Sequence, residues 1–222
     1  MMGGLGEYAI SVAMFSPEFA QALFLVLCRL AGRSFAMSRQ IVEDLPRSGS
    51  AGRQSRHGRQ GRLEAVYVAY LLSVEGCRDL IRVLGPTIAV ITMQGRVEIL
   101  FNLYTFVAAS RFDANVRDKG VQLKRPIQAM AHILAVSVYA TRTRSQARAV
   151  LRSLVKLDPT EWSEAEQATT DAVIQLVETN QVEFNAWQIM ELDMQLVVSV
   201  AGWTVSQLVV LAQAAQPDSS RR

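Results

Sequence analysis

The stretch that decides the fold is Met194–Pro217, MQLVVSVAGWTVSQLVVLAQAAQP, the longest run of the chain without a charged residue. Its 24 residues exceed the roughly 20 that an α-helix needs to cross the hydrocarbon core of a bilayer. Trp203 and several glutamines make the run less apolar than a simple anchor, so a buried helix of a soluble protein stays open as an alternative. We expect a transmembrane helix over residues 194–216.

Three further segments are weaker candidate spans: residues 8–28, 83–110 and 126–141. The first contains Glu18, the second contains Arg96 and Glu98, and the third is uncharged but only 16 residues long. One ionised side chain at the bilayer centre raises the free energy of insertion by about 3 kcal/mol, whereas each Leu or Val lowers it by about 0.5 kcal/mol. None of the three would insert alone, so they need a bundle. The sequence thus predicts an all-α polytopic membrane protein, one helical membrane domain over residues 1–222 with about four transmembrane helices and long cytoplasmic helical extensions.

Composition excludes several classes of protein. Hydrophobic residues make up 50% of the chain, which rules out intrinsic disorder. Cys28 and Cys77 are the only cysteines, too few for a disulfide framework. Neither His57 nor His132 lies in a metal-binding spacing, and no nucleophile elbow or glycine-rich phosphate loop occurs. We therefore expect no familiar enzyme activity, no bound metal and no cofactor.

Arginines gather in residues 39–62, whose core RSGSAGRQSRHGRQGR is rich in Gly and Ser and has no apolar periodicity. This composition predicts a flexible loop. Arginine can neutralise nucleic-acid phosphates, but no recognition helix or interleaved aromatic accompanies the cluster, and the net charge is only +3. The positive-inside rule explains the cluster more simply, because it places this loop and the basic segment that begins at Arg142 in the cytoplasm.

The segment over residues 162–187 is expected to form an amphipathic, water-facing helix, since its apolar residues recur at three- and four-residue steps. Thr160 is the first choice of N-cap in TEWSEAE, and Ser163 is the second. We expect this helix to run into the final span with few residues between them.

Small and polar residues form one stripe along the final helix, because their separations of four, three, four and seven residues follow the helical period: Gln195, Ser199, Gly202, Ser206 and Gln213. In a membrane such a stripe either packs closely against another helix or lines a water-filled pore. The spacing alone leaves both uses open.

Two short motifs lie near the C-terminus: Ser206–Ala214, SQLVVLAQA, and an upstream pattern of Phe184-Asn185-Ala186, Met190 and Leu192-Asp193. They resemble motifs of the insect-type gustatory receptors, seven-helix chemoreceptors related to insect odorant receptors. The family's last helix ends in Thr-Tyr-x-Val-x-Leu-x-Gln-Phe. The chain matches it at Val, Leu and Gln, but has Gln in place of Tyr and Ala in place of Phe.

The resemblance implies a ligand-gated cation channel subunit that detects small-molecule tastants, a multi-pass protein of the plasma membrane. It implies a homo- or heterotetramer in which Ser206, Val210 and Gln213 line the pore. The ligand would occupy an outward-opening pocket, for which the candidates are Phe101, Tyr104 and His132, with ordinary packing as the alternative role of each. The family's first three helices have no counterpart, so a C-terminal fragment or truncated member is expected.

A function of another class competes with the receptor. The chain is then a soluble or peripheral α-helical interaction protein, whose apolar C-terminal helix is a core or dimer helix.

Overall fold

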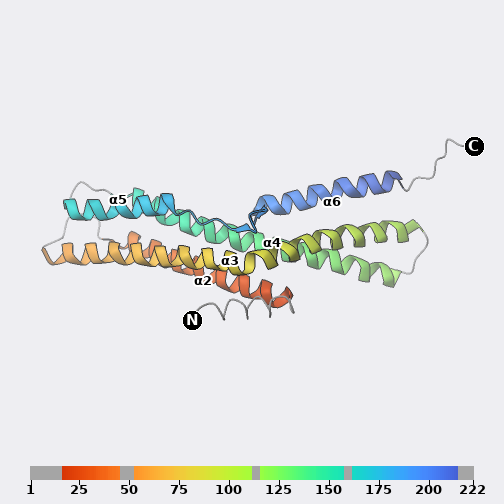
Figure 1. Ribbon diagram of the computed structural model, residues 1–222, viewed down its shortest axis with the longest axis horizontal. Helices are drawn as coiled ribbons and strands as arrows, with labels where there is room; N and C mark the ends of the chain where they lie inside the picture. The colour runs from red at the N-terminus through yellow and green to blue at the C-terminus, as the bar shows by residue number, and fades with distance from the viewer. Residues whose placement is uncertain (1–16, 46–52, 112–115, 158–161, 215–222) are drawn as a thin grey trace, which may run out of the picture. The chain divides into compact units, whose positions relative to one another are not determined.

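The computed structural model describes residues 17–45, 53–111, 116–157 and 162–214. These residues form five α-helices and one two-stranded sheet: α2 (Pro17–Glu43), α3 (Arg53–Arg111), α4 (Val116–Val155), α5 (Glu164–Thr179), β1 (Asn185–Ala186), β2 (Met190–Glu191) and α6 (Met194–Ala214) (Figure 1). The protein is therefore mostly helical, as the sequence predicts.

The chain divides into two compact units, and α2, α3 and α4 each contribute to both. The ranges are 1–21, 84–138 and 185–222 for unit 1, and 22–83 and 139–184 for unit 2. In α3 the division falls between Val83 and Leu84, where the sequence predicts that a span begins. In α4 it follows Val138, three residues before the predicted end of a span at Thr141. The sequence-predicted spans of α3 and α4 thus lie almost wholly in unit 1.

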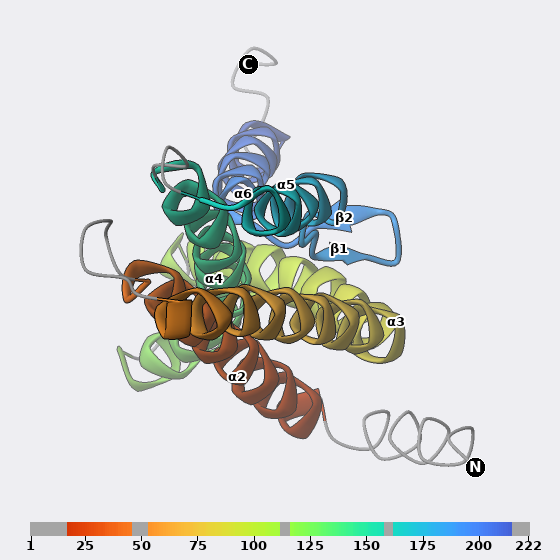
Figure 2. The same cartoon turned by 90° about the vertical axis from the view of Figure 1, so that its left-hand side faces the viewer.

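Unit 2 is a group of four helical segments taken from α2, the first half of α3, the second half of α4 and α5 (Figures 1 and 2). Buried aromatic rings join them: Phe35 and Tyr70 have ring centroids 5.3 Å apart. The hydroxyl oxygens of Ser34 and Ser73 lie 2.7 Å apart, so α2 and α3 approach closely there. Aromatic pairs of this kind add about 0.5–1.5 kcal/mol beyond the effect of their buried area.

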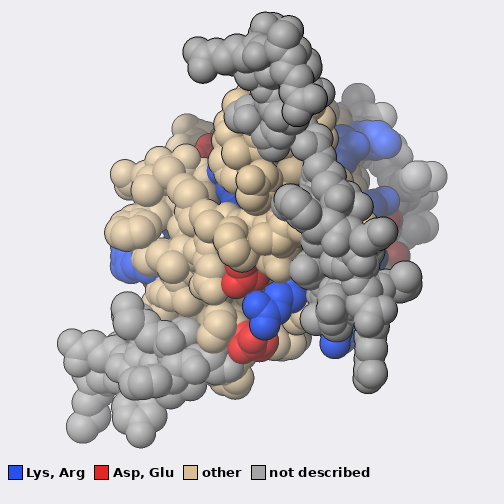
Figure 3. Space-filling view, turned by 90° about the vertical axis from the view of Figure 1, so that its right-hand side faces the viewer, with Lys and Arg blue, Asp and Glu red and all other residues tan. Residues whose placement is uncertain are grey.

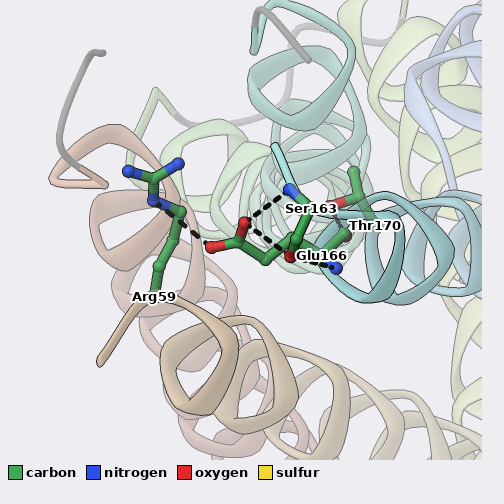
Figure 4. Close-up of polar contacts among 4 residues, drawn as sticks. All are labelled: Arg59, Ser163, Glu166 and Thr170. Atoms are coloured by element: carbon green, nitrogen blue, oxygen red, sulfur yellow. Dashed lines mark hydrogen bonds and ion pairs between the residues drawn. The ribbon is translucent and has the colours of Figure 1, made fainter. Parts of the chain in front are cut away.

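A capping box begins α5. Ser163 Oγ accepts a hydrogen bond from the Glu166 amide at 3.4 Å, and Glu166 Oε2 accepts one from the Ser163 amide at 2.9 Å. The other carboxylate oxygen, Oε1, lies 3.7 Å from Arg59 Nε of α3, and both side chains are almost fully buried (Figure 4). The Arg59 guanidinium also lies 5.9 Å from the centroid of a Trp162 ring. Ser163, the second-choice cap, is correct, and Thr160 lies outside the described residues.

The predicted flexible loop over residues 39–62 is wrong for most of its described residues, and residues 46–52 lie outside the described part of the chain. Helix α2 continues to Glu43, and α3 already begins at Arg53. Arg and Gln are good helix formers, and they outweigh the cost of the two glycines in this part of α3. Arg39 Nε also donates to Glu43 Oε1 at 2.7 Å, an i,i+4 pair in the last turn of α2.

The predicted continuous helix over residues 162–187 is also wrong, because α5 ends at Thr179. An antiparallel pair of short strands follows, with Ala186 opposite Met190. The turn between the strands places Trp187 and Gln188 at φ 57°, in the left-handed region. This hairpin, rather than a helix, leads into α6.

In unit 1, α3 and α4 pack closely at Gly95. A Cβ atom on this glycine would lie 3.5 Å from Ile133 Cδ1 and 3.8 Å from Ala129 Cβ. Helix α6 begins at Met194, as predicted. Asp193 Oδ1 caps it by accepting hydrogen bonds from the amides of Gln195 and Leu196, at 2.9 and 3.1 Å.

Within the described residues, three helical segments are long and apolar enough to cross a membrane: Pro17–Glu43, Gly58–Phe106 and Met194–Leu211. The fourth predicted span, residues 126–141, is helical in α4 but does not meet the same criteria of length and composition. Basic residues bound its uncharged run on both sides, so any longer window gains charge. These criteria thus identify three of the predicted spans in part or whole, and residues 8–16 of the first predicted span lie outside the described residues. The number of about four crossings stays a prediction.

Candidate ligand-binding cleft and pore helix

A cleft of about 230 Å³ lies in unit 1, between the first turn of α2, α3 and α4. Two helical faces line it, each with the spacing i, i+3, i+4, i+7: Ile91, Gln94, Gly95 and Glu98 on α3, and Arg125, Gln128, Ala129 and His132 on α4. That spacing brings four side chains to one side of a helix. The close approach at Gly95 keeps the floor of the cleft narrow.

The lining of this cleft is polar, although the parts of α3 and α4 that form it are otherwise largely apolar. Its polar groups are two carboxylates, one guanidinium, one imidazole and three carboxamides: Glu18, Glu98, Arg125, His132, Gln21, Gln94 and Gln128. Gln94 Nε2 donates to Glu98 Oε1 at 3.1 Å, which orients that carboxylate. Binding pockets usually hold a few such convergent polar groups. This lining suits a small ligand that offers several hydrogen-bonding groups or charges of both signs.

Of the three predicted ligand-binding residues, only His132 lines the cleft, where it is half-buried. Phe101 and Tyr104 do not line it, and they are 65% and 38% exposed. An α-helix turns by about 100° per residue. Tyr104 therefore lies on the opposite side of α3 from Gly95. Phe101 and Tyr104 therefore lie on another side of α3 than this cleft, and ligand binding by them stays a prediction.

The sequence offers a signal for the residues that were missed. Gln94 and Glu98 on α3, and Arg125 and His132 on α4, repeat at helical spacing within two otherwise apolar segments. Paired polar faces of this kind on neighbouring helices predict a shared polar site.

Helix α6 presents its predicted polar stripe to the outside of the chain. Ser206, Val210 and Gln213 are all exposed, and a Cβ atom on Gly202 would meet nothing within 4 Å. Ser206 Oγ donates to the Gly202 carbonyl oxygen at 2.9 Å, so its hydroxyl is satisfied within the helix. The stripe is therefore not used to pack α6 against another described helix of the same chain.

Among the α6 side chains that the structure describes, the buried ones form a single row four residues apart: Leu196, Val200 and Thr204. Large apolar residues elsewhere on the helix are exposed, among them Val198 at 71% and Val205 at 62%. Such exposure is uncommon on a folded soluble surface, where large apolar patches mark a lipid or protein contact.

The upstream motif has a structural role. Phe184 is fully buried and packs edge-on against Phe24 in unit 2, with ring centroids 6.2 Å apart. Ala186, Met190 and Leu192 are also buried, in unit 1. These positions hold the hairpin in place, so packing alone explains their apolar character.

Cys28 and Cys77 are buried free cysteines. In the part of the chain that the structure describes, no group of three or more His, Cys, Asp or Glu residues could hold a metal ion.

No known family model matches the chain, and no protein of curated function matches it either. The resemblance to gustatory receptors therefore rests on the two C-terminal motifs.

Proposed function

We propose that the chain is a multi-pass membrane protein that acts as a gustatory-type chemoreceptor subunit, a ligand-gated cation channel of the plasma membrane. Helix α6 carries this proposal. It has 21 residues and no charge, and among its side chains that the structure describes only one row is buried within the chain. A bilayer or a neighbouring α6 would cover the rest of its apolar surface.

The distribution of charge supports a membrane orientation. Unit 2 contains the Arg-rich parts of α2, α3 and α4, and the predicted spans of α3 and α4 lie almost wholly in unit 1. The positive-inside rule then places unit 2 in the cytoplasm. On the face drawn in Figure 3, uncharged residues dominate the described surface.

The ligand would bind in the unit 1 cleft. Its mixed lining of Glu18, Glu98, Arg125 and His132 favours a small polar molecule with hydroxyl or zwitterionic groups over an apolar odorant. A volume of about 230 Å³ is below the roughly 300–1,000 Å³ of drug-sized sites, so the expected tastant is small.

The pore would form between α6 helices of four subunits. Val210 would supply a hydrophobic ring that gates by dewetting, and Gln213, nearly one turn further on, would replace part of the hydration shell of a passing cation. Ser206 would lie on the same wall, one turn before Val210.

Recording of ligand-evoked current in oocytes tests the channel. Replacing Gln213 by Ala should change cation permeability or conductance, whereas replacing the half-buried Gln207 by Ala, on another side of α6, should not. Identical currents from the Gln213→Ala channel and the unmodified channel would remove the pore assignment.

The competing function is that of a soluble or peripheral helical interaction protein. In that protein the same exposed α6 would form the dimer contact. Carbonate extraction separates the two: an integral protein stays in the membrane pellet, whereas a peripheral one is released without detergent. Release into the supernatant would end the receptor proposal.

A further inference from the structure

A second cleft, in unit 2, is lined by arginines from two helices. It has a volume of about 370 Å³ and lies between α2 and α4. Arg29 and Arg33, one turn apart on α2, line it together with Arg142 of α4. Among the described residues no Asp or Glu contributes to its walls.

Close packing of α2 on α4 brings these three arginines together. The buried Thr143 hydroxyl, next to Arg142, lies 2.9 Å from the carbonyl oxygen of Cys28, next to Arg29. Gly32 faces the same contact, since a Cβ atom there would lie 3.6 Å from Thr143 Oγ1. The cleft is thus built on a fixed helix crossing.

Three arginines of unit 2 outside the cleft have a carboxylate oxygen within 4.0 Å, in the pairs Arg39–Glu43, Arg59–Glu166 and Arg82–Asp79. Within the described part of the chain, no such partner reaches Arg29, Arg33 or Arg142. Three positive charges around one cleft, with no carboxylate of the described residues within 4.0 Å of them, favour an external anion.

We propose that this cleft binds the phosphate groups of an anionic phospholipid headgroup in the cytoplasmic leaflet. Guanidinium groups bind phosphate oxygens through paired N–H donors, and Tyr139 and Gln146 add neutral donors to the lining. The choice of a lipid rests on the proposed membrane insertion. The predicted spans end at Cys28 and Thr141, so the arginines follow directly where the headgroups of that leaflet begin.

The full chain, purified in a mild detergent, is titrated with three probes: short-chain phosphatidylinositol bisphosphate, short-chain phosphatidylcholine and free inositol trisphosphate. The test variant combines Arg29→Gln, Arg33→Gln and Arg142→Gln. Its matched control removes the same charge from unit 2 away from the cleft, by Arg62→Gln, Arg82→Gln and Lys156→Gln.

The test variant is expected to bind the bisphosphate lipid about a hundredfold more weakly, from about fivefold per arginine, while the control variant binds nearly as the unmodified chain does. Arg33→Gln alone, at an exposed position, should give about a fivefold loss and keeps the test valid if the triple variant does not fold.

Equal losses in the two triple variants would overturn the site, because net charge alone would then explain binding. Equal affinity of the unmodified chain for phosphatidylcholine and for the bisphosphate lipid would also overturn it. If inositol trisphosphate binds as tightly as the bisphosphate lipid, the cleft recognises phosphate groups but not the lipid, and the lipid assignment is overturned. Carbonate extraction reports separately on membrane insertion, so failure of the proposed function is distinguishable from failure of this site.

Discussion

The Thr143 hydroxyl oxygen of α4 lies 2.9 Å from the Cys28 carbonyl oxygen of α2, and equally 2.9 Å from the Tyr139 carbonyl oxygen of its own helix. One hydroxyl proton is therefore shared between two acceptors. Thr143 is only 2% exposed and Cys28 is fully buried, so water does not compete for the bond. This hydrogen bond fixes the position of α2 along α4 where the two helices pack in unit 2.

Replacing Thr143 by Val keeps the shape of the side chain and removes the hydroxyl group. We expect the free energy of unfolding to fall by about 1 kcal/mol, the usual net value of one buried hydrogen bond. Urea unfolding in detergent, followed by circular dichroism, measures it. Thr169→Val is the control, because the exposed Thr169 hydroxyl donates only to Ala165 of its own helix. Equal effects of the two variants would show that the contact between helices contributes nothing.

The buried pair of Arg59 and Glu166 gives a second prediction. Gln at position 166 can keep the capping box, but it leaves the Arg59 guanidinium buried without a counter-charge. Loss of one partner of a buried ion pair costs roughly 3 kcal/mol or more, so Glu166→Gln should lower the unfolding free energy by that amount. The same urea experiment measures the change.

Two further variants isolate the cause. Ser163→Ala removes the cap and the hydrogen bond that Ser163 Oγ donates to Glu166 Oε2 at 2.9 Å, but keeps both charges of the ion pair, and should cost about 1 kcal/mol. Adding Arg59→Met to Glu166→Gln removes the stranded charge and should recover part of the lost stability. If Glu166→Gln costs no more than Ser163→Ala, the ion pair is not a stabilising contact.

The helical class and several element boundaries could be predicted from local sequence. The uncharged run that starts at Met194 begins α6, where Asp193 provides the cap. The change from charged to apolar residues near Val83 lies at the boundary between the two units in α3. In both places a local property, charge or capping, determines the structure.

The hairpin before α6 could not be predicted in this way. Two consecutive residues with positive φ usually call for Asn or Gly, but here they are Trp187 and Gln188. Each such residue costs about 1–3 kcal/mol, so the surrounding packing must impose the turn. The buried neighbours Phe184, Ala186 and Met190 are in position to do so. The tertiary packing of the chain determines which side chains these three residues contact, and a sequence pattern does not specify that packing.

The polar cleft of unit 1 gives a prediction about ligand response. Replacing Glu98 by Gln removes a charged acceptor that faces the cleft, and the concentration for half-maximal current should rise about tenfold or more. Tyr104→Phe, which alters a residue outside the cleft, should leave it unchanged. The opposite result would mean that the ligand binds along the face of α3 with Phe101 and Tyr104.

A single charge on α6 separates the membrane protein from its competitor. Val205 lies near the middle of α6 and is 62% exposed. If α6 crosses a bilayer, Val205→Asp adds about 3 kcal/mol to insertion and should largely abolish it, whereas Val205→Leu should not. If α6 is the dimer helix of a soluble protein, no insertion is expected for the unmodified chain or for either variant. Translation with microsomes, using a glycosylation acceptor added after the last residue, measures insertion. Absence of glycosylation in the unmodified chain would contradict the predicted crossing. Undiminished glycosylation of the Asp variant would contradict the position of Val205 near the bilayer centre, because α6 contains no oppositely charged residue.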